Sequence, residues 1–196
     1  MRLAEHLRPG LILNMSTRTV MGGLIRRALR FGWDGRLSDI PNHDAIVVRH
    51  YGKTYIGESK PPFAGLTPIE DYERMVESGE VYNLRIMAVA GAHEEQELLA
   101  SAWWLSNVNR KPYDWMAFPR LLWKATMADW CPRAAGWEWA WDCTEGVRDA
   151  YKIGAGVDPW GKNNPTPLTT FKRALERKLI VLRHIGESVT RKGGTL

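Results

Sequence analysis

Cys143 stands where an aromatic, apolar stretch of the sequence gives way to a helix-like pattern. Val147, Ala150 and Tyr151 follow it at the spacing of one helical face. Asp142, which precedes it, is of a residue type that commonly caps helices, so Cys143 is expected in the first helical turn. There the unpaired backbone N–H groups and the helix dipole favour a thiolate and can stabilise an oxyanion. Cys143 is therefore the candidate nucleophile, although a lone cysteine is more commonly a small buried apolar residue.

A nucleophilic cysteine needs a base that handles its proton and a polar group that orients the base. Among the five histidines, His43 directly precedes the short apolar run at residues 44–48, so a rigid strand would carry it. The other histidines lie in the N-terminal region, at a turn, at a helix start and after the last predicted strand: His6, His50, His93 and His184. His43 is therefore the candidate base, although a histidine at a strand end is commonly structural or exposed.

Glu58 is the candidate orienting residue. It lies in the run at residues 54–58, which follows the first run after a turn at residues 51–53 and predicts an antiparallel hairpin. In that hairpin, His43 and Glu58 lie near the same open end of adjacent strands. A carboxylate there can hold an imidazole in one tautomer and stabilise its protonated form, although an ordinary edge-strand glutamate is the alternative.

A metal site made of His43, Glu58 and Asp44 is a further alternative. No tight ligand spacing supports it, and no Cys/His pattern typical of zinc is present. We therefore predict neither a metal nor a cofactor.

The rest of the chain predicts an α+β fold, with a small antiparallel sheet packed against helices. Apolar or alternating runs predict strands at residues 11–13, 44–48, 54–58, 82–89 and 179–182. Helical spacing predicts helices at about residues 20–31, 68–79, 94–107, 115–130 and onward from 143. Residues 61–65 are expected to form a loop because they contain two prolines and a glycine. Thr67 is then expected to cap the next helix, with Glu70 completing a capping box.

Composition limits the classes of function. The chain has 196 residues, enough for one domain with a real core, and a formal net charge of +5. Lysines and arginines gather early and late in the chain without a nucleic-acid-binding motif, so we predict no specific nucleic-acid partner. Spread over helices, such charges usually form a solvated face, and peripheral contact with an anionic cell wall or membrane is the alternative.

Three further expectations come from the cysteines, the N-terminus and the tryptophans. Cys131 and Cys143 alone do not make a disulfide framework, so a reduced compartment is expected. We find no secretory signal or membrane-spanning run, so the expected location is cytoplasmic by default, or virion-associated if the gene belongs to a phage. Most of the ten tryptophans lie from Trp103 to Trp141, a stretch that suits a core, a substrate groove or a partner surface.

Several of these residues carry a resemblance to a known family. The chain resembles the circularly permuted papain-like cysteine hydrolases of the NlpC-related superfamily, a group of permuted amidases that includes YiiX-like proteins. The matching stretches are the opening strand at residues 9–13, the base-bearing strand at 42–48, the next strand at 55–58 and the nucleophile helix at 141–151. The order His43, Glu58, Cys143 is the permuted order. Three positions differ: Leu11 stands where the family has aspartate, Asp44 where it is usually apolar, and Thr144 where it usually has serine. The Trp-rich segment from Trp115 to Trp141 is also longer than the family pattern.

The resemblance implies the extent and the chemistry of the domain. It covers the chain from about residue 9 to 185 and implies one permuted papain-like hydrolase domain over residues 1–185, with a Trp-rich helical insertion at about 115–141. The last residues, 186–196, are expected to form a flexible tail. The resemblance also implies a cysteine peptidase or amidase that cleaves an amide or ester bond through a thioester acyl-enzyme. The implied catalytic residues are Cys143, His43 and Glu58.

The resemblance also suggests what the protein acts on. Peptidoglycan-type peptides or lipid acyl groups, in a phage or bacterial setting, are the expected substrates. Tyr113, Trp139 and Trp141 are expected to bind them, because they lie in the aromatic stretch before the nucleophile or in the family-like Pro-Tyr-Asp turn. The alternative is a non-catalytic structural or partner-binding module on the same fold, with the Trp-rich surface as its interface.

Overall fold

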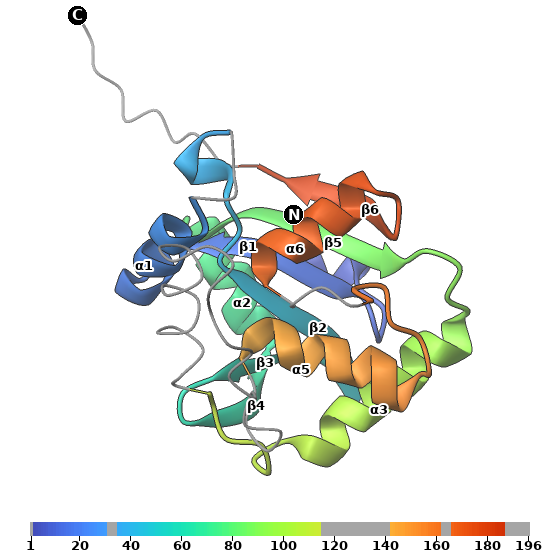
Figure 1. The fold of residues 1–196 in the computed structure, drawn as a ribbon. Coiled ribbons are helices and arrows are strands. Elements are labelled where there is room, and N and C mark those ends of the chain that lie inside the picture. Colours follow the sequence, from blue (N-terminus) through green and yellow to red (C-terminus); the bar gives the residue numbers. More distant parts are fainter. Residues whose placement is uncertain (1, 31–34, 115–141, 162–165, 187–196) are drawn as a thin grey trace, which may run out of the picture.

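The computed structural model describes residues 2–30, 35–114, 142–161 and 166–186. Two expected features lie outside these residues: the Trp-rich insertion at 115–141, with Cys131, Trp139 and Trp141, and the tail from residue 187. Within the described residues the chain is a mixed α+β structure built on a six-stranded antiparallel sheet (Figure 1). None of the described helices is long and apolar enough to cross a lipid bilayer.

The sheet has the strand order β4-β3-β2-β1-β5-β6. Its strands are β1 (Ile12–Thr17), β2 (His43–His50), β3 (Lys53–Lys60), β4 (Phe63–Pro68), β5 (Val81–Val89) and β6 (Leu179–Ile185). The described helices are α1 (Val20–Leu29), α2 (Ile69–Glu77), α3 (Glu94–Asn107), α5 (Cys143–Asp149) and α6 (Pro167–Leu175). Short helical turns lie at η1 (Leu3–His6), η3 (Leu37–Asp39) and η5 (Ala150–Gly154).

The hairpin predicted between the two apolar runs is formed by β2 and β3. Tyr51 and Gly52 connect the strands, and both have positive φ, 47° and 75°. This is the backbone conformation that the commonest two-residue hairpin turns require. The hairpin register pairs Ile46 with Gly57, so the open ends of the two strands lie side by side at His43 and Glu58.

Helices cover both faces of the sheet, which explains why β2 is apolar along most of its length rather than alternating. Ile46 and Val48 belong to a core cluster that includes residues of α3 and α5, whereas Ala45 and Val47 belong to a second cluster with residues of α2. Figure 1 shows α5 and α6 in front of the sheet and α2 behind it. The hairpin is therefore held from both sides.

The prediction of a loop at residues 61–65 is wrong for residues 63–65. Residues from Phe63 onward form β4, which pairs with β3 and places Gly65 opposite Glu58. Thr67 lies in that strand rather than at a helix cap, and α2 begins at Ile69 after Pro68. An edge strand tolerates proline, because its outward N–H groups need no partner strand. Because β4 pairs with β3 on the side away from β2, β3 is an interior strand, and Glu58 is flanked by strands on both sides.

The residue before Glu58 must be small. Trp104 of α3 is fully buried in the cluster on that face. A Cβ atom added to Gly57 would lie no more than 2.9 Å from three atoms of the Trp104 indole ring. Glycine at this position therefore lets α3 pack directly against the backbone of β3.

Gly57→Ala is expected to lower the free energy of unfolding by about 1–3 kcal/mol, because the added methyl group overlaps a ring that has no room to move. Gly23→Ala in α1 is the matched control, since a Cβ atom there meets nothing within 4 Å. It is expected to be neutral or to stabilise by up to about 1 kcal/mol. Urea unfolding followed by circular dichroism measures both. Equal stability of Gly57→Ala and the wild type would contradict the tight β3–α3 contact.

Candidate active site

Cys143 is the first residue of α5, and the predicted start of this helix is confirmed. Asp142 is the N-cap, and its Oδ1 accepts the backbone N–H groups of Thr144 and Glu145, each at 2.8 Å. The Glu145 carboxylate in turn accepts the backbone N–H of Asp142 at 3.3 Å, which completes a capping box. Cys143 is 7% exposed and forms no disulfide. The local sequence therefore fixes the cysteine at a helix N-terminus.

The structure brings the three predicted triad residues together. His43 is the first residue of β2, and its Nε2 lies 2.8 Å from Oε2 of Glu58 on β3. Cys143 raises the pKa of His43 through its nearby side chain and its charge, so the two side chains are close neighbours. Because Nε2 faces Glu58, Nδ1 is the ring nitrogen left to face the thiol. Residues from β2, β3 and α5 thus lie together, with His43 bonded to Glu58 and next to Cys143.

The hairpin register explains how His43 reaches Glu58. Ile46 pairs with Gly57, so Glu58 falls across from Ala45, two residues inward from His43. Residues two apart on a strand point to the same face, which makes His43 and Glu58 diagonal neighbours. The Cα atoms of diagonal neighbours on adjacent strands lie about 7–8 Å apart, a distance that a glutamate and a histidine side chain can bridge.

Glu58 is 5% exposed, and both of its carboxylate oxygens are engaged. Oε2 accepts the Tyr72 hydroxyl at 2.8 Å in addition to His43. Oε1 accepts the Lys60 ammonium at 2.7 Å and the Thr67 hydroxyl. Lys60, Thr67 and Tyr72 come from β3, β4 and α2 and were not expected from the sequence. Of these three, only Lys60 could have been predicted from the sequence, because it lies two residues beyond Glu58 and therefore on the same face of the strand.

These contacts shift the pKa values of the pair in opposite directions. For Glu58 the largest single effect is burial, which raises its pKa. The hydrogen bond and charge of His43, together with the charge of Lys60, outweigh burial and hold the pKa of Glu58 far below its usual value. Burial likewise lowers the pKa of His43, but the bonds and charges of Cys143 and Glu58 outweigh it and raise the pKa to about 10. His43 is therefore protonated and Glu58 ionised at neutral pH.

Tyr113 lies near the nucleophile. Its backbone N–H donates to the carbonyl of Pro62 at 2.9 Å, which attaches the segment after α3 to the β3–β4 turn. Burial raises the pKa of Tyr113, and Cys143 and Asp142 are the next two groups that raise it. Tyr113 is therefore close enough to Cys143 to feel its charge. The other two expected substrate-binding residues, Trp139 and Trp141, lie outside the described residues.

Asp44 does not join His43 and Glu58. It is fully buried, and its carboxylate accepts hydrogen bonds from Asn14, Thr144 and Thr170. Over the described parts of the chain, no three His, Cys, Asp or Glu side chains are arranged to hold a metal ion.

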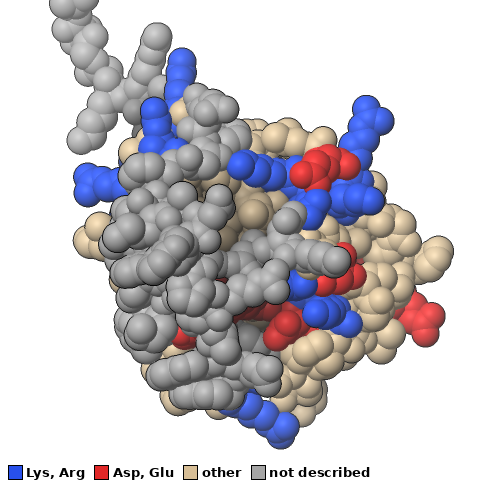
Figure 2. Space-filling model, viewed as in Figure 1, with Lys and Arg blue, Asp and Glu red and all other residues tan. Residues whose placement is uncertain are grey.

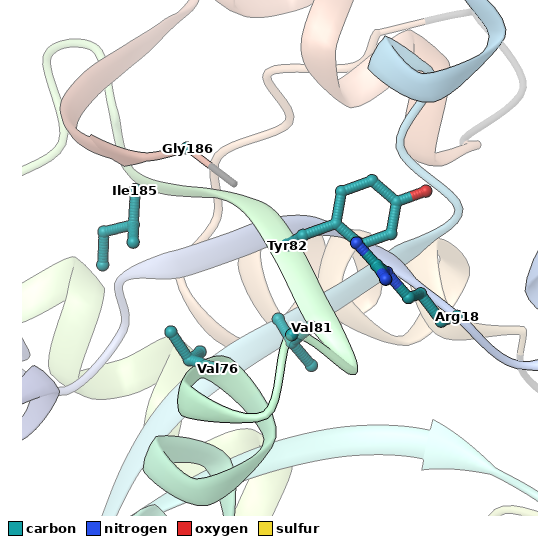
Figure 3. A pocket seen from close by; sticks show the side chains of 7 residues that line it. Arg18, Val76, Val81, Tyr82, Ile185 and Gly186 are labelled. Atoms are coloured by element: carbon teal, nitrogen blue, oxygen red, sulfur yellow. The ribbon is translucent and has the colours of Figure 1, made fainter. Parts of the chain in front are cut away.

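A pocket lies away from these residues, at the ends of β5, β6 and α2 (Figure 3). Its lining residues are Arg18, Val76, Gly79, Val81, Tyr82, Ile185 and Gly186. The guanidinium groups of Arg18 and Arg26 lie 5.3 and 5.7 Å from the centre of the Tyr82 ring. No predicted site residue lines this pocket, so it does not contribute to the triad.

No family model and no curated protein matches the chain. Among solved structures, the chain is similar to the crystal structure described as metalloprotein YiiX from Escherichia coli O157:H7. The two have a TM-score of 0.53 and 17% sequence identity, and the match covers 92% of this chain and 89% of that chain. The fold is thus YiiX-like over nearly its whole length. At this identity the likeness concerns the fold alone.

The His43–Glu58 pair is expected to stabilise the fold in a limited pH window. The raised pKa of His43 adds stability below its ordinary value of 6.5 that is lost as the pH rises through about 10. The lowered pKa of Glu58 adds stability above its ordinary value of 4.5 that is lost on acidification. Glu58→Gln should therefore destabilise the protein most near pH 6, and the difference from the wild type should shrink toward pH 10.

Urea unfolding at both pH values measures this difference, and NMR titration of His43 should show a lower pKa in the Glu58→Gln variant. Glu77→Gln, on the exposed end of α2, is the control and should show no such trend. A Glu58→Gln effect of the same size at pH 6 and pH 10 would contradict the ion pair.

Proposed function

We propose that the protein is a cysteine hydrolase that cleaves an amide or ester bond with Cys143 as nucleophile, His43 as acid and base, and Glu58 as orienting residue. The observation that carries the proposal is the position of His43, which is bonded to Glu58 at 2.8 Å and lies beside Cys143 at the start of α5. A protonated imidazole between a thiol group and a buried carboxylate is the arrangement that keeps a cysteine ionised and ready to attack.

In the first step, the Cys143 thiolate attacks the substrate carbonyl carbon and forms a carbon–sulfur bond. The carbonyl oxygen becomes an oxyanion next to the N-terminus of α5. The N–H groups of Thr144 and Glu145 are committed to the Asp142 side chain, so the N–H of Cys143 is the first-turn donor assigned to the oxyanion.

The oxyanion then collapses and expels the leaving group, which takes the proton from His43 as its bond to carbon breaks. This leaves an acyl thioester on Cys143 and a neutral imidazole. In the second half, His43 takes a proton from water while the water oxygen attacks the thioester carbon. The carbon–sulfur bond breaks, the acid is released, and Cys143 and His43 return to the thiolate and imidazolium forms.

Glu58 stays ionised through both halves of the reaction. Its four donors hold the carboxylate in one orientation, and its bond to Nε2 keeps the His43 ring turned toward Cys143. Tyr72 remains a donor throughout, because burial and the charge of Glu58 raise the pKa of its hydroxyl well above the usual value.

Within this class, we propose the permuted papain-like architecture of the NlpC-related amidases. The YiiX-like fold, the chain order His43, Glu58, Cys143 and the start of α5 at the nucleophile support it. Peptidoglycan-type peptides or lipid acyl groups are the proposed substrates.

Figure 2 shows the Lys and Arg side chains in separate groups around one face of the molecule rather than in one patch. This distribution supports a solvated face more than a docking surface for an anionic polymer.

The similar YiiX structure is described as a metalloprotein, but the surroundings of Glu58 in this chain disfavour a metal ion. The Lys60 ammonium contacts one oxygen of Glu58, and two donors occupy the other. A cation at Glu58 would be repelled by Lys60 and by protonated His43. The described residues around the triad therefore do not fit a metal ion.

Alkylation of Cys143 tests the nucleophile directly. Iodoacetamide at mildly acidic pH should modify Cys143 in the folded protein, because a neighbouring imidazolium and a helix N-terminus both favour the reactive form of a cysteine. His43→Asn should slow the reaction at least about tenfold at that pH. Peptide mass mapping with Cys131 as the internal reference measures both rates. Equal, slow modification of the two cysteines would contradict the proposed pair.

Acyl transfer tests the reaction without knowledge of the substrate. p-Nitrophenyl acetate should acetylate Cys143 and release nitrophenolate in a burst, visible by absorbance and by the mass of the intact protein. Cys143→Ala should abolish both signals, whereas Cys131→Ala should retain them. Glu58→Gln should slow the burst by about 10²-fold, through loss of the imidazole orientation. If the wild-type protein forms no acyl-enzyme and Cys143→Ala keeps its biological activity, the chain is a binding module instead.

A further inference from the structure

A second buried polar cluster lies beside the triad and takes no part in the reaction proposed above. Its centre is Asp44, which follows His43 in β2 and is fully buried. Oδ2 of Asp44 accepts the hydroxyls of Thr144 at 2.8 Å and of Thr170 at 2.7 Å. Oδ1 accepts Nδ2 of Asn14 at 2.7 Å. One carboxylate therefore joins the central strands β1 and β2 to the helices α5 and α6.

Each partner of Asp44 has a second contact, and for the Thr144 hydroxyl it is Sγ of Cys143 at 3.9 Å. Nδ2 of Asn14 also donates to the carbonyl of Pro167, at 2.9 Å. The Thr170 hydroxyl oxygen accepts the indole N–H of Trp160 at 3.0 Å. Because the partners have fixed orientations, the position of Oδ2 is fixed as well, and so is the place of the Thr144 hydroxyl that donates to it.

Thr144 is the residue directly after the nucleophile. The contact between Asp44 and Thr144 therefore lies next to the contact between His43 and Cys143, and both join the start of β2 to the start of α5. A hydrogen bond to a carboxylate is short and directional. An apolar pair at these two positions would pack without setting the distance and angle between the strand and the helix.

We infer that Asp44 is a positioning residue, which through Thr144 fixes the N-terminus of α5 against β2 and so holds the Cys143 thiol in front of His43. This inference rests on the proposed function, since it assigns Asp44 a part in the reactivity of Cys143. The charged groups that face Asp44 are His43 on its own strand and Arg85 on β5. Asp44 touches neither the thiol nor the imidazole through any bond described above, so its effect passes through Thr144.

The test compares two threonines that donate to the same oxygen. Thr144→Val and Thr170→Val each remove one hydroxyl from Oδ2 of Asp44, but only Thr144 lies on the nucleophile helix. Thr144→Ser keeps the hydroxyl and serves as the rescue. The rate of Cys143 alkylation by iodoacetamide is measured over a range of pH in the folded protein, together with thermal stability. Hydrogen exchange of the α5 amides is measured on the same variants.

Thr144→Val is expected to slow alkylation of Cys143 about tenfold at mildly acidic pH and to move the pH profile upward, as loss of one charge-assisted bond implies. Thr144→Ser should stay within about twofold of the wild type. Thr170→Val should lower thermal stability at least as much as Thr144→Val, because it also leaves the Trp160 indole without its acceptor, yet slow alkylation less than about threefold. Asp44→Asn should resemble Thr144→Val.

The outcomes separate the inference from the proposed function. If both valine variants slow alkylation in proportion to their loss of stability, Asp44 is merely structural and the inference is overturned. It is also overturned if Thr144→Val changes neither the pH profile nor the exchange of the α5 amides. If wild-type Cys143 is unreactive while Thr144→Val alone speeds exchange at the start of α5, Asp44 fixes the helix as inferred and the hydrolase proposal fails.

Discussion

The site depends on keeping one carboxylate ionised in a buried place. Moving Glu58 out of water costs several kcal/mol, a cost that its attraction to His43 offsets only if the remaining lone pairs are also satisfied. Lys60, Thr67 and Tyr72 meet that requirement, and they come from three different elements. β4 and α2 are thus required by the chemistry of Glu58 as well as by the packing of the core. Over the described residues, no buried side-chain nitrogen or oxygen lacks a hydrogen-bond partner.

The second constraint is that the site joins both layers of the molecule. Tyr72, which holds Glu58, belongs to the core cluster behind the sheet, whereas Val147, one turn after Cys143, belongs to the cluster in front of it. The base and the nucleophile therefore meet at the end of β2, where the two layers adjoin. A sheet covered on both faces makes this meeting point rigid, because neither the strand nor the helix can shift without disturbing a packed cluster.

Sequence reasoning succeeded where a short stretch determines its own structure. Asp142 caps α5 through its neighbours, and Tyr51–Gly52 turns the hairpin that brings Glu58 to His43. It failed where a residue's role depends on distant elements. Pro61, Pro62 and Gly65 indicated a loop, but the two prolines form only the turn before β4, and that strand supplies Thr67 to Glu58. The hydroxyl of Tyr72 has no signal at all in the helical pattern, because its partner lies on another element.

The contact between Asp44 and Thr144 is another feature that the sequence could not predict, and it lies beside the proposed active site. Compared with the family that the sequence resembles, each is a separate departure, an acid in an apolar place and a threonine in place of serine. In the structure they are a single contact of 2.8 Å. A buried carboxylate alone would be destabilising, and so would a buried hydroxyl without an acceptor, but together with Asn14 and Thr170 they satisfy each other. The buried acid at position 44 is therefore understandable only together with the hydroxyl at position 144, and the two residues lie next to the proposed base and nucleophile.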